Sequence, residues 1–533
     1  MPFLLKVIGS LTTVVSVCEP GARSTDAGSK PTSFSGDDSS PFREARSGLP
    51  GQCCCLGRMM DDAPRPTAPP RPGGWVDATL LAGGEDDVCL WLGRGVDRRA
   101  LRELVASEQR KLQAAGLAAG GTVSLRLPPS LAYVASLLAA WRVGAQVSLL
   151  DHRLTQYEVD RALDRLRPQV LVQVDERVAS KVSAMRGFAE VETAAERRAG
   201  GHDATTGHAL VQLSSGSTGP SKVIARTADD LIAELERYAK LDGYPRRGER
   251  IVCLASVVHV LGLVGGLLHS LHAGVQLVFV ERLTPDGILA AVAAGDERTM
   301  VLGVPFHAEL LTSFAKPPPL PQLVRMVVAG ELVRPHVPGA FTARYGVPLG
   351  TMYGMTELGV IATDLHGRTR PAVAPAPGMR LRTEDGELLV RMAGSPYIGL
   401  VDPTRWSDGW LHTRDAADLD PATGLVTILG RLDSQVSVGG LKVDLTEVEQ
   451  TLAALPGVTE VVVAFDGVIT AYLAVEAGAA TADIEQAIAY QLAAFKRPRR
   501  IHVVPSLPRT ASGKIVRDRA ALRRMVDHER VNP

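Results

Sequence analysis

The sequence predicts an α/β protein of at least two domains: a large N-terminal part and a small α+β unit at the C-terminal end. The first observation is the alternation of strand-like apolar runs with helical patterns of about 10–15 residues, which indicates parallel sheets with helices on their faces. The second is a change after Glu357 to shorter strands and turns, which indicates a small β-subdomain. The third is the length of 533 residues, which exceeds what one hydrophobic core supports.

The expected elements of the N-terminal part follow in a regular order. Helices are predicted where apolar residues recur at helical spacing or where a capping pattern such as Thr155–Glu158 opens a segment. They are expected at 101–117, 131–143, from 155, at 228–241, up to 271, and at 285–294. Strands are predicted at short apolar runs, namely 122–127, 145–150, 170–174, 209–213, 251–254, 276–280, 299–304, 324–328, 387–390, 410–413 and 425–429.

A domain boundary is expected at Gly430-Arg431-Leu432-Asp433. Beyond it, helices are predicted at 446–455 and 481–494, and strands at 458–465, 469–475 and 502–504. These elements would form a compact unit of about 100 residues, which is an ordinary size for a small domain.

Composition excludes several classes of protein. Lys and Arg number 58 and Asp and Glu number 58, so no single-sign field attracts nucleic acid or an anionic membrane. Apolar runs are interrupted well before the ~18 residues that a membrane span requires. The six cysteines show no paired metal-ligand spacing, which argues for a reducing compartment, the cytoplasm, and against a disulfide framework.

Residues 1–75 differ from the rest of the chain. They are rich in Ser, Gly, Pro and Asp and have few periodic apolar positions, so a disordered N-terminal extension is expected. Two alternatives remain open. The mildly apolar stretch from Phe3 to Val17 could belong to a signal peptide, although Lys6 interrupts it. The true start could instead be Met59 or Met60.

A loop of small and hydroxyl residues, SSGSTGPSK at 214–222, follows the apolar run 209–213. Glycines allow the backbone to approach a ligand closely, and successive N–H groups, hydroxyls and a lysine can hold a polyphosphate. The common P-loop is excluded because its Gly-Lys pair and its spacing are missing. The alternative is a flexible surface loop.

Five segments together resemble the adenylate-forming superfamily of acyl-CoA synthetases, aryl-acid ligases, peptide-synthetase adenylation domains and luciferases. The segments are SSGSTGPSK at 214, YGMTE at 353, HTRD at 412, GRLDSQVSVGGLKVDLTEVE at 430 and PRTASGK at 508. The resemblance covers roughly residues 76–525 and implies a stand-alone AMP-dependent acid ligase. It divides the chain into an extension (1–75), an ATP- and acid-binding adenylation domain (76–431), a hinge, and a mobile C-terminal lid domain (432–533).

The resemblance also implies a reaction. A carboxylate attacks the α-phosphate of ATP, giving acyl-AMP and pyrophosphate, and a second nucleophile then takes the acyl group. Attack by an anion on a polyanion depends on positioning and charge neutralisation, which suits the residue types present.

The resemblance assigns the nucleotide-binding residues. Those of the loop hold the β- and γ-phosphates; they are Ser214, Ser215, Gly216, Ser217, Thr218, Gly219 and Lys222. The remaining set is Gly330, Glu331, Tyr353, Gly354, Met355, Asp415 and Arg431, in which Tyr353 stacks on adenine and Asp415 accepts the ribose hydroxyls. Thr356 contacts the α-phosphate, and Glu357 binds Mg²⁺ together with Thr218.

The C-terminal part carries further assignments by resemblance. Lys514 is the mobile catalytic charge between the carboxylate and the α-phosphate, and Asp433 is the hinge. In the second half-reaction the acceptor side is formed by Gly439, Gly440 and Lys442. One departure is Arg414, where the family has a small residue; we expect it to be a solvated surface charge, the alternative being a phosphate contact.

The acid pocket is expected at His259, Gly262, Gly266, Gly303, Ala329 and Met355. By resemblance His259 lies near the acyl carbonyl and has a catalytic role; a histidine buried in the core is the alternative. Residues 255–266 contain no acidic side chain to hold an ammonium group, so a carboxylic acid without an α-amino group is expected. The glycines favour a roomy apolar cavity for an aromatic or bulky acyl group.

The acceptor is open at this point. No carrier domain follows Lys514, so a free acceptor is expected, with coenzyme A first, an amine in bacterial secondary metabolism second, and a separate carrier protein third. A non-catalytic nucleotide-binding protein is disfavoured because Glu357, Asp415 and Lys514 occur together. Hydrolase motifs such as G-x-S-x-G and H-E-x-x-H are absent from the sequence.

Overall fold

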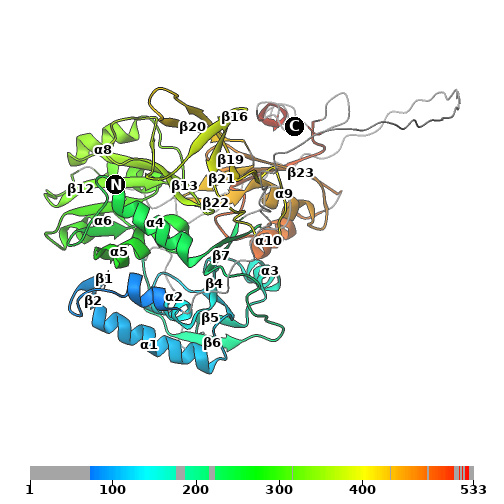
Figure 1. The fold of residues 1–533 in the computed structure, drawn as a ribbon. Helices are drawn as coiled ribbons and strands as arrows, with labels where there is room; N and C mark the ends of the chain where they lie inside the picture. The colour runs from blue at the N-terminus through cyan, green and yellow to red at the C-terminus, as the bar shows by residue number, and fades with distance from the viewer. Residues whose placement is uncertain are drawn as a thin grey trace, which may run out of the picture.

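The computed structural model describes residues 73–175, 187–214, 222–314, 316–432, 434–476, 479–508, 515, 519 and 522–526. Figure 1 shows two large sheet regions one above the other, with the C-terminal domain at the side of both. The α/β architecture, the small β-subdomain and the small α+β C-terminal domain are as the sequence predicts.

The first region is a six-stranded sheet in the order β6-β5-β3-β4-β7-β8, in which β5, β3, β4 and β7 run parallel. Its strands are β3 (Thr122–Arg126), β4 (Gln146–Leu149), β5 (Val170–Val174), β6 (Thr193–Arg197), β7 (Leu210–Ser214) and β8 (Lys222–Arg226). Its helices are α1 (Arg98–Ala114), α2 (Leu131–Val143) and α3 (Gln156–Leu166). Helix α2 is buried from Tyr133 to Trp141 because it lies in the core that both sheets share.

The second region is a nine-stranded sheet in the order β15-β14-β13-β12-β11-β9-β10-β1-β2, parallel from β13 to β1. Its strands are β1 (Val88–Leu92), β2 (Gly95–Asp97), β9 (Arg250–Cys253), β10 (Gln276–Phe279), β11 (Thr299–Gly303), β12 (Leu323–Ala329), β13 (Leu349–Met355), β14 (Gly359–Asp364) and β15 (Ala374–Pro375). Its helices are η1 (Val76–Leu80), α4 (Ala228–Lys240), η2 (Leu261–Leu268), α5 (His269–Ala273), α6 (Pro285–Ala293), α7 (Pro305–Thr312) and α8 (Val337–Tyr345).

The small β-subdomain consists of β16 (Leu381–Glu384), β17 (Glu387–Arg391), β18 (Trp406–Ser407), β19 (Trp410–Leu419) and β20 (Val426–Arg431). The C-terminal domain begins with the hairpin β21 (Gln435–Val438) and β22 (Leu441–Asp444). It continues with α9 (Leu445–Ala453), β23 (Val458–Phe465), β24 (Ile469–Val475), α10 (Thr481–Gln491) and β25 (Arg500–Val504), and has its own hydrophobic core.

Most predicted elements occur within a few residues of their expected positions. The capping box is present at the start of α3, where Thr155 and Glu158 satisfy each other's backbone N–H groups. The elements that were not predicted include β1, β2, β6, β8, β14, the hairpin β21–β22, α7 and α8. The predicted glycine-rich helix is wound as the π-helix η2 before it continues as α5. Among the described residues, no helix is long and apolar enough to cross a membrane.

Candidate active site

The site lies where parallel strands of the two sheets end. Strands β9, β11, β12 and β13 are parallel neighbours, so their carboxyl ends lie at one edge, which is where α/β proteins bind ligands. The segments that follow β9, β11 and β12 carry His259, Val304 and Gly330, and the last residues of β13 include Tyr353, in that spatial order. Much of the predicted site is therefore brought together by the strand order.

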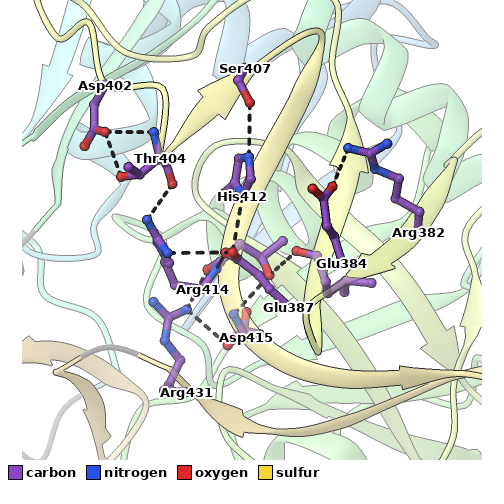
Figure 2. Close-up of polar contacts among 12 residues, drawn as sticks. Arg382, Glu384, Glu387, Asp402, Thr404, Ser407, His412, Arg414, Asp415 and Arg431 are labelled. Carbon is purple, nitrogen blue, oxygen red and sulfur yellow. Dashed lines mark hydrogen bonds and ion pairs between the residues drawn. The ribbon is translucent and has the colours of Figure 1, made fainter.

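Tyr353, Asp415 and Arg431 form one hydrogen-bonded group. The Tyr353 hydroxyl donates to Asp415 Oδ2 at 2.6 Å, and Arg431 Nη1 donates to Asp415 Oδ1 at 3.1 Å. Figure 2 shows Arg431 reaching Asp415 from β20. Burial, and then the Asp415 charge, raise the pKa of Tyr353 well above its usual value, so the phenol keeps its proton and remains a donor. Asp415 is thus a buried acceptor with a fixed orientation, which suits a pair of ribose hydroxyls.

Arg414 is not the solvated charge that the sequence suggested. Its guanidinium donates to the Thr404 carbonyl at 2.7 Å and lies 3.7 Å from Glu387 Oε2, while its backbone N–H donates to Glu387 Oε1 at 2.7 Å (Figure 2). His412 lies 3.2 Å from the same carboxylate. The prediction failed because Glu387 on β17 is distant in sequence. The backbone of Arg414 has φ 60°, a conformation that favours glycine, so this network holds a strained residue next to Asp415.

Glu357 lies just after β13, and its Oε1 accepts a hydrogen bond of 2.9 Å from the Tyr397 hydroxyl. Among the described residues, no hydrogen bond or ion pair engages its other carboxylate oxygen, which could therefore bind a cation. One carboxylate oxygen together with phosphate oxygens and water is ordinary Mg²⁺ ligation, so Glu357 fits the expected role. Within the described parts of the chain, no cluster of three or more His, Cys, Asp or Glu side chains could hold a metal without such help.

The C-terminal domain touches this edge through the tip of the β21–β22 hairpin. The Gly440 N–H donates to Glu331 Oε1 at 2.7 Å, and Lys442 Nζ lies 3.5 Å from the Gly330 carbonyl oxygen. Lys442 as a whole is exposed, yet desolvation of its ammonium group, followed by the charge of Arg431, lowers its pKa. The hairpin therefore lies beside the residues expected to bind the nucleotide.

A second contact between the domains lies on helix α3. The Lys496 ammonium is 2.9 Å from Glu158 and 3.0 Å from Glu447. These two carboxylates raise the pKa of Lys496 despite its burial, so the lysine stays charged between them. The rings of Tyr157 and Tyr490 are 5.9 Å apart beside this group. The contact fixes the C-terminal domain in the orientation that brings the hairpin to the site.

His259 lies at the end of β9 and is 41% exposed, so it is not a core histidine. Its Nε2 is 3.5 Å from Oδ2 of Asp151, a buried residue just beyond β4. Asp151 was missed as a site residue, although its position after a parallel strand adjacent to β7 is a signal for it. Burial opposes ionisation, but Arg153 and His259 hold the pKa of Asp151 well below its usual range.

The glycines of the expected acid pocket do not enclose open space. A Cβ on Gly262 would lie 2.4 Å from the Ser256 carbonyl oxygen, and one on Gly266 would lie 3.0 Å from Cys253 Sγ. A Cβ on Gly303 would likewise lie 3.0 Å from His307 Nδ1. The expectation of a roomy cavity at these positions is wrong, because the glycines permit close packing of η2 and β11. At the neighbouring Gly330, by contrast, an added Cβ would meet no described atom within 4 Å.

Several expected site residues lie outside the described part of the chain: Ser215, Gly216, Ser217, Thr218, Gly219, Asp433 and Lys514. For Ser214 the backbone is described, and it pairs with Lys222 across the antiparallel strands β7 and β8. The remaining positions Ala329, Gly354, Met355 and Thr356 lie at the ends of β12 and β13. A Cβ on Gly354 would lie 2.4 Å from the Gly359 carbonyl, so this glycine allows the close turn after Tyr353.

The chain is similar to known proteins over most of its length. Residues 83–394 match the AMP-binding enzyme family, and residues 447–514 match its C-terminal domain. The chain is 27% identical over 510 residues to 4-coumarate–CoA ligase 5 of Oryza sativa subsp. japonica, covering 82% of this chain and 92% of that protein.

Two solved structures share the fold. One is o-succinylbenzoate CoA synthetase from Bacillus subtilis, with a TM-score of 0.71, 22% identity and coverage of 84% of this chain and 97% of that one. The other is an amide bond synthetase from Marinactinospora thermotolerans, with a TM-score of 0.68, 24% identity and coverage of 85% and 99%. The chain therefore belongs to the AMP-binding enzyme family, the adenylate-forming acid ligases.

Proposed function

We propose that this chain activates a carboxylic acid without an α-amino group as acyl-AMP, releases pyrophosphate, and transfers the acyl group to free coenzyme A. The observation that carries the proposal is the group formed by Tyr353, Asp415 and Arg431 at the strand edge, within reach of the hairpin tip. A buried carboxylate held by two donors presents fixed acceptor positions, as a ribose requires.

The order of residues along the edge gives the direction of the substrate. Tyr353 lies near the carboxyl end of β13, and His259 lies in the segment after β9, which is three strands away in the same sheet. With neighbouring strands about 4.8 Å apart, the two positions are about 14 Å apart, which is the scale of a nucleotide phosphate joined to an acyl group. The adenosine would bind near β13, and the acyl group would extend toward β9.

The acid is proposed to be aromatic or bulky and uncharged at its far end. Residues 255–266 include apolar side chains, such as Val258 and Leu261, and no acidic residue. The nearby carboxylate of Asp151 is already paired with Arg153, so we do not expect it to hold a substrate ammonium. Gly330 leaves its Cβ space open beside the hairpin. Since the glycines of η2 are closely packed, we place the acyl group along the strand edge between Gly330 and His259 rather than inside η2.

Mg²⁺ is proposed to bind to the free oxygen of Glu357 and to the triphosphate, where it would neutralise charge on the phosphates. Tyr397 orients Glu357 for this role. We also propose a cytoplasmic location. The buried thiols Cys89 and Cys253 are unpaired, and burial raises their pKa values to about 11 and about 12, which suits a reducing compartment.

An amine acceptor is the second candidate, with a place in secondary metabolism. It is supported by the Asp151–His259 pair, because an amine needs a proton acceptor at the point of attack more than a thiol does. Transfer to a separate carrier protein is the third.

The test is pyrophosphate release with ATP, Mg²⁺ and a panel of benzoate, 4-coumarate, anthranilate and octanoate. Each acid is run with coenzyme A, with a primary amine, and alone. An acyl-CoA product supports the proposal, and an amide product supports the second candidate. L-Phenylalanine and L-alanine are run beside the panel, and acid-dependent turnover confined to them would refute the proposed acid class. The absence of acid-dependent pyrophosphate release with any of these acids would refute the proposed activity.

A further inference from the structure

The carboxylate of Asp151 has an unusual set of partners for a residue at the end of a strand. Arg153 binds it with two nitrogens, Nε to Oδ1 at 2.8 Å and Nη2 to Oδ2 at 2.5 Å, and the Arg153 N–H donates to Oδ1 at 2.9 Å. The remaining neighbours are His152, with Nδ1 3.6 Å from Oδ1, and His259, with Nε2 3.5 Å from Oδ2. Asp151 is therefore fixed by Arg153 and directed at His259.

Two side-chain hydrogen bonds hold the backbone of the segment that carries His259. The Tyr133 hydroxyl donates to the Val257 carbonyl at 2.7 Å, and the Gln212 side chain donates to the Val258 carbonyl at 2.8 Å. Gln212 lies on β7, which leads directly into the Ser/Gly loop. His259 is therefore at a defined position between the strand that enters this loop and the edge that the hairpin contacts.

Arg153 is also in contact with the C-terminal domain. Its guanidinium carbon lies 5.8 Å from the centre of the Phe495 ring, a distance typical of a cation–π contact. Phe495 directly precedes Lys496, whose ammonium binds Glu158 on α3. Docking of the C-terminal domain and orientation of Asp151 thus share one segment, residues 151–158.

We propose that Asp151 and Arg153 are positioning residues for the acyl-transfer step, and that docking of the C-terminal domain completes them through Phe495. The inference rests on the proposed function. His259 Nε2 is buried, lies 3.5 Å from Asp151 Oδ2 and has no hydrogen-bond partner among the described residues. In this inference the carboxylate favours the tautomer that carries its proton on Nε2, so that Nδ1 is left as the proton acceptor. As the acceptor's sulfur or nitrogen bonds to the acyl carbon, its proton passes to Nδ1, the bond from the acyl carbon to the AMP oxygen breaks, and AMP leaves as the anion.

This arrangement separates the two half-reactions. Adenylate formation involves two anions and no proton on the nucleophile, so it has no use for a proton acceptor. Transfer consumes a nucleophile that carries a proton, and we assign the docked position of the hairpin tip to this step. Substitutions in the Asp151 group should therefore slow transfer selectively.

The experiment measures both steps on the full chain. Adenylate formation is followed by pyrophosphate release. Transfer is followed by mixing the enzyme with the purified adenylate of whichever panel acid turns over fastest, and with coenzyme A or the primary amine, whichever the wild type uses. Asp151→Asn retains the oxygen that accepts the Arg153 N–H and loses the charge. We expect the ratio of transfer to adenylate formation to fall at least about tenfold, through kcat rather than the KM for the acceptor.

A double-mutant cycle distinguishes positioning from a general structural effect. If Asp151 acts through His259, Asp151→Asn has no further effect on transfer in the His259→Ala background. Phe495→Leu, on the C-terminal domain, removes the ring that contacts Arg153 and should lower the same ratio. Because Phe495 also packs against the core of that domain, the ratio of the two half-reactions, measured at a temperature where the variant is folded, is the readout. Three results would overturn the inference. One is that the two substitutions lower the transfer rate additively in the cycle. The others are that a variant loses adenylate formation and transfer equally, or that the ratio of the two rates is unchanged in Asp151→Asn and Phe495→Leu. Failure of the wild type to form any adenylate would instead refute the proposed function.

Discussion

The tip of the β21–β22 hairpin gives the sharpest test of how the C-terminal domain docks. Gly439 and Gly440 both have positive φ, 57° and 82°, so alanine at either position strains the turn by about 1–2 kcal/mol. The two differ in their surroundings. A Cβ on Gly440 would lie 2.5 Å from Val304 Cγ1 in the N-terminal part, whereas a Cβ on Gly439 would meet no atom within 4 Å.

Backbone strain within the hairpin is common to every orientation of the domain, but the collision with Val304 occurs only when the hairpin is docked. Overpacking of this kind costs about 1–3 kcal/mol, which corresponds to a population change of about 5- to 150-fold. Gly440→Ala should therefore slow acyl transfer by that factor relative to adenylate formation. Gly439→Ala is the matched control and should leave the ratio of the two rates near the wild-type value.

Pyrophosphate release and transfer from purified adenylate supply the two rates for each variant. A second check is Gly440→Ala combined with Val304→Ala, which removes the colliding methyl groups and should restore the ratio. The reasoning is refuted if Gly439→Ala and Gly440→Ala change the ratio equally, or if Val304→Ala gives no recovery.

Four further predictions concern other parts of the chain. Lys496→Met leaves Glu158 and Glu447 facing each other without their cation, and loss of one partner of a buried ion pair costs about 3–5 kcal/mol, so acyl transfer should slow strongly. Lys316→Met, at an exposed position, should have no effect on acyl transfer. Equal transfer rates in the two variants would contradict the docking role of Lys496. Lys514→Ala should lower adenylate formation by a factor of roughly 10² or more, and unaltered pyrophosphate release would show that Lys514 is wrongly assigned. Burial lowers the pKa of His269 to about 4, so between pH 6.5 and 4 the unfolded chain binds a proton that the folded chain does not, and the free energy of unfolding should fall by about 2 kcal/mol at pH 5 relative to neutral pH. His269→Gln can still donate to the Pro245 carbonyl and should remove this part of the acid sensitivity in thermal melts at pH 5 and 7.5. An unchanged difference between the two pH values would exclude His269 as its source. Deletion of residues 1–58 should leave soluble yield and pyrophosphate release intact, because that segment lacks a core-forming pattern, and insoluble protein would contradict this.

The sequence predicted those features that depend on local pattern. The capping box at Thr155 and Glu158 occurs as expected because both partners lie within one helical turn. The parallel strands were legible as apolar runs, and their order brings Tyr353 and the segment of His259 to one edge. Motif resemblance, rather than pattern, identified Asp415 and Arg431, which are distant from Tyr353 in sequence and in direct contact with its hydroxyl group in the fold.

Features that depend on distant partners were not predictable. The second role of Glu158, as a partner of Lys496, requires the docked C-terminal domain. Arg414 was expected to be a surface charge because its partner Glu387, 3.7 Å away in the fold, is distant from it in the sequence. The glycines of η2 suggested an open cavity, but the hydroxyl of Tyr238, 2.7 Å from the Cβ position of Gly265, shows that such glycines can equally serve close packing. A sequence rich in glycine therefore does not distinguish an open cavity from close packing.

The central claim is that a carboxylate attacks the α-phosphate of ATP at this site. The most direct measurement uses a panel acid labelled with ¹⁸O in both carboxylate oxygens, followed by mass spectrometry of the AMP after transfer to the acceptor. The account predicts that each AMP carries one ¹⁸O, because the oxygen that bonds to phosphorus leaves with the nucleotide. Unlabelled AMP, or ADP with phosphate in place of AMP with pyrophosphate, would contradict it.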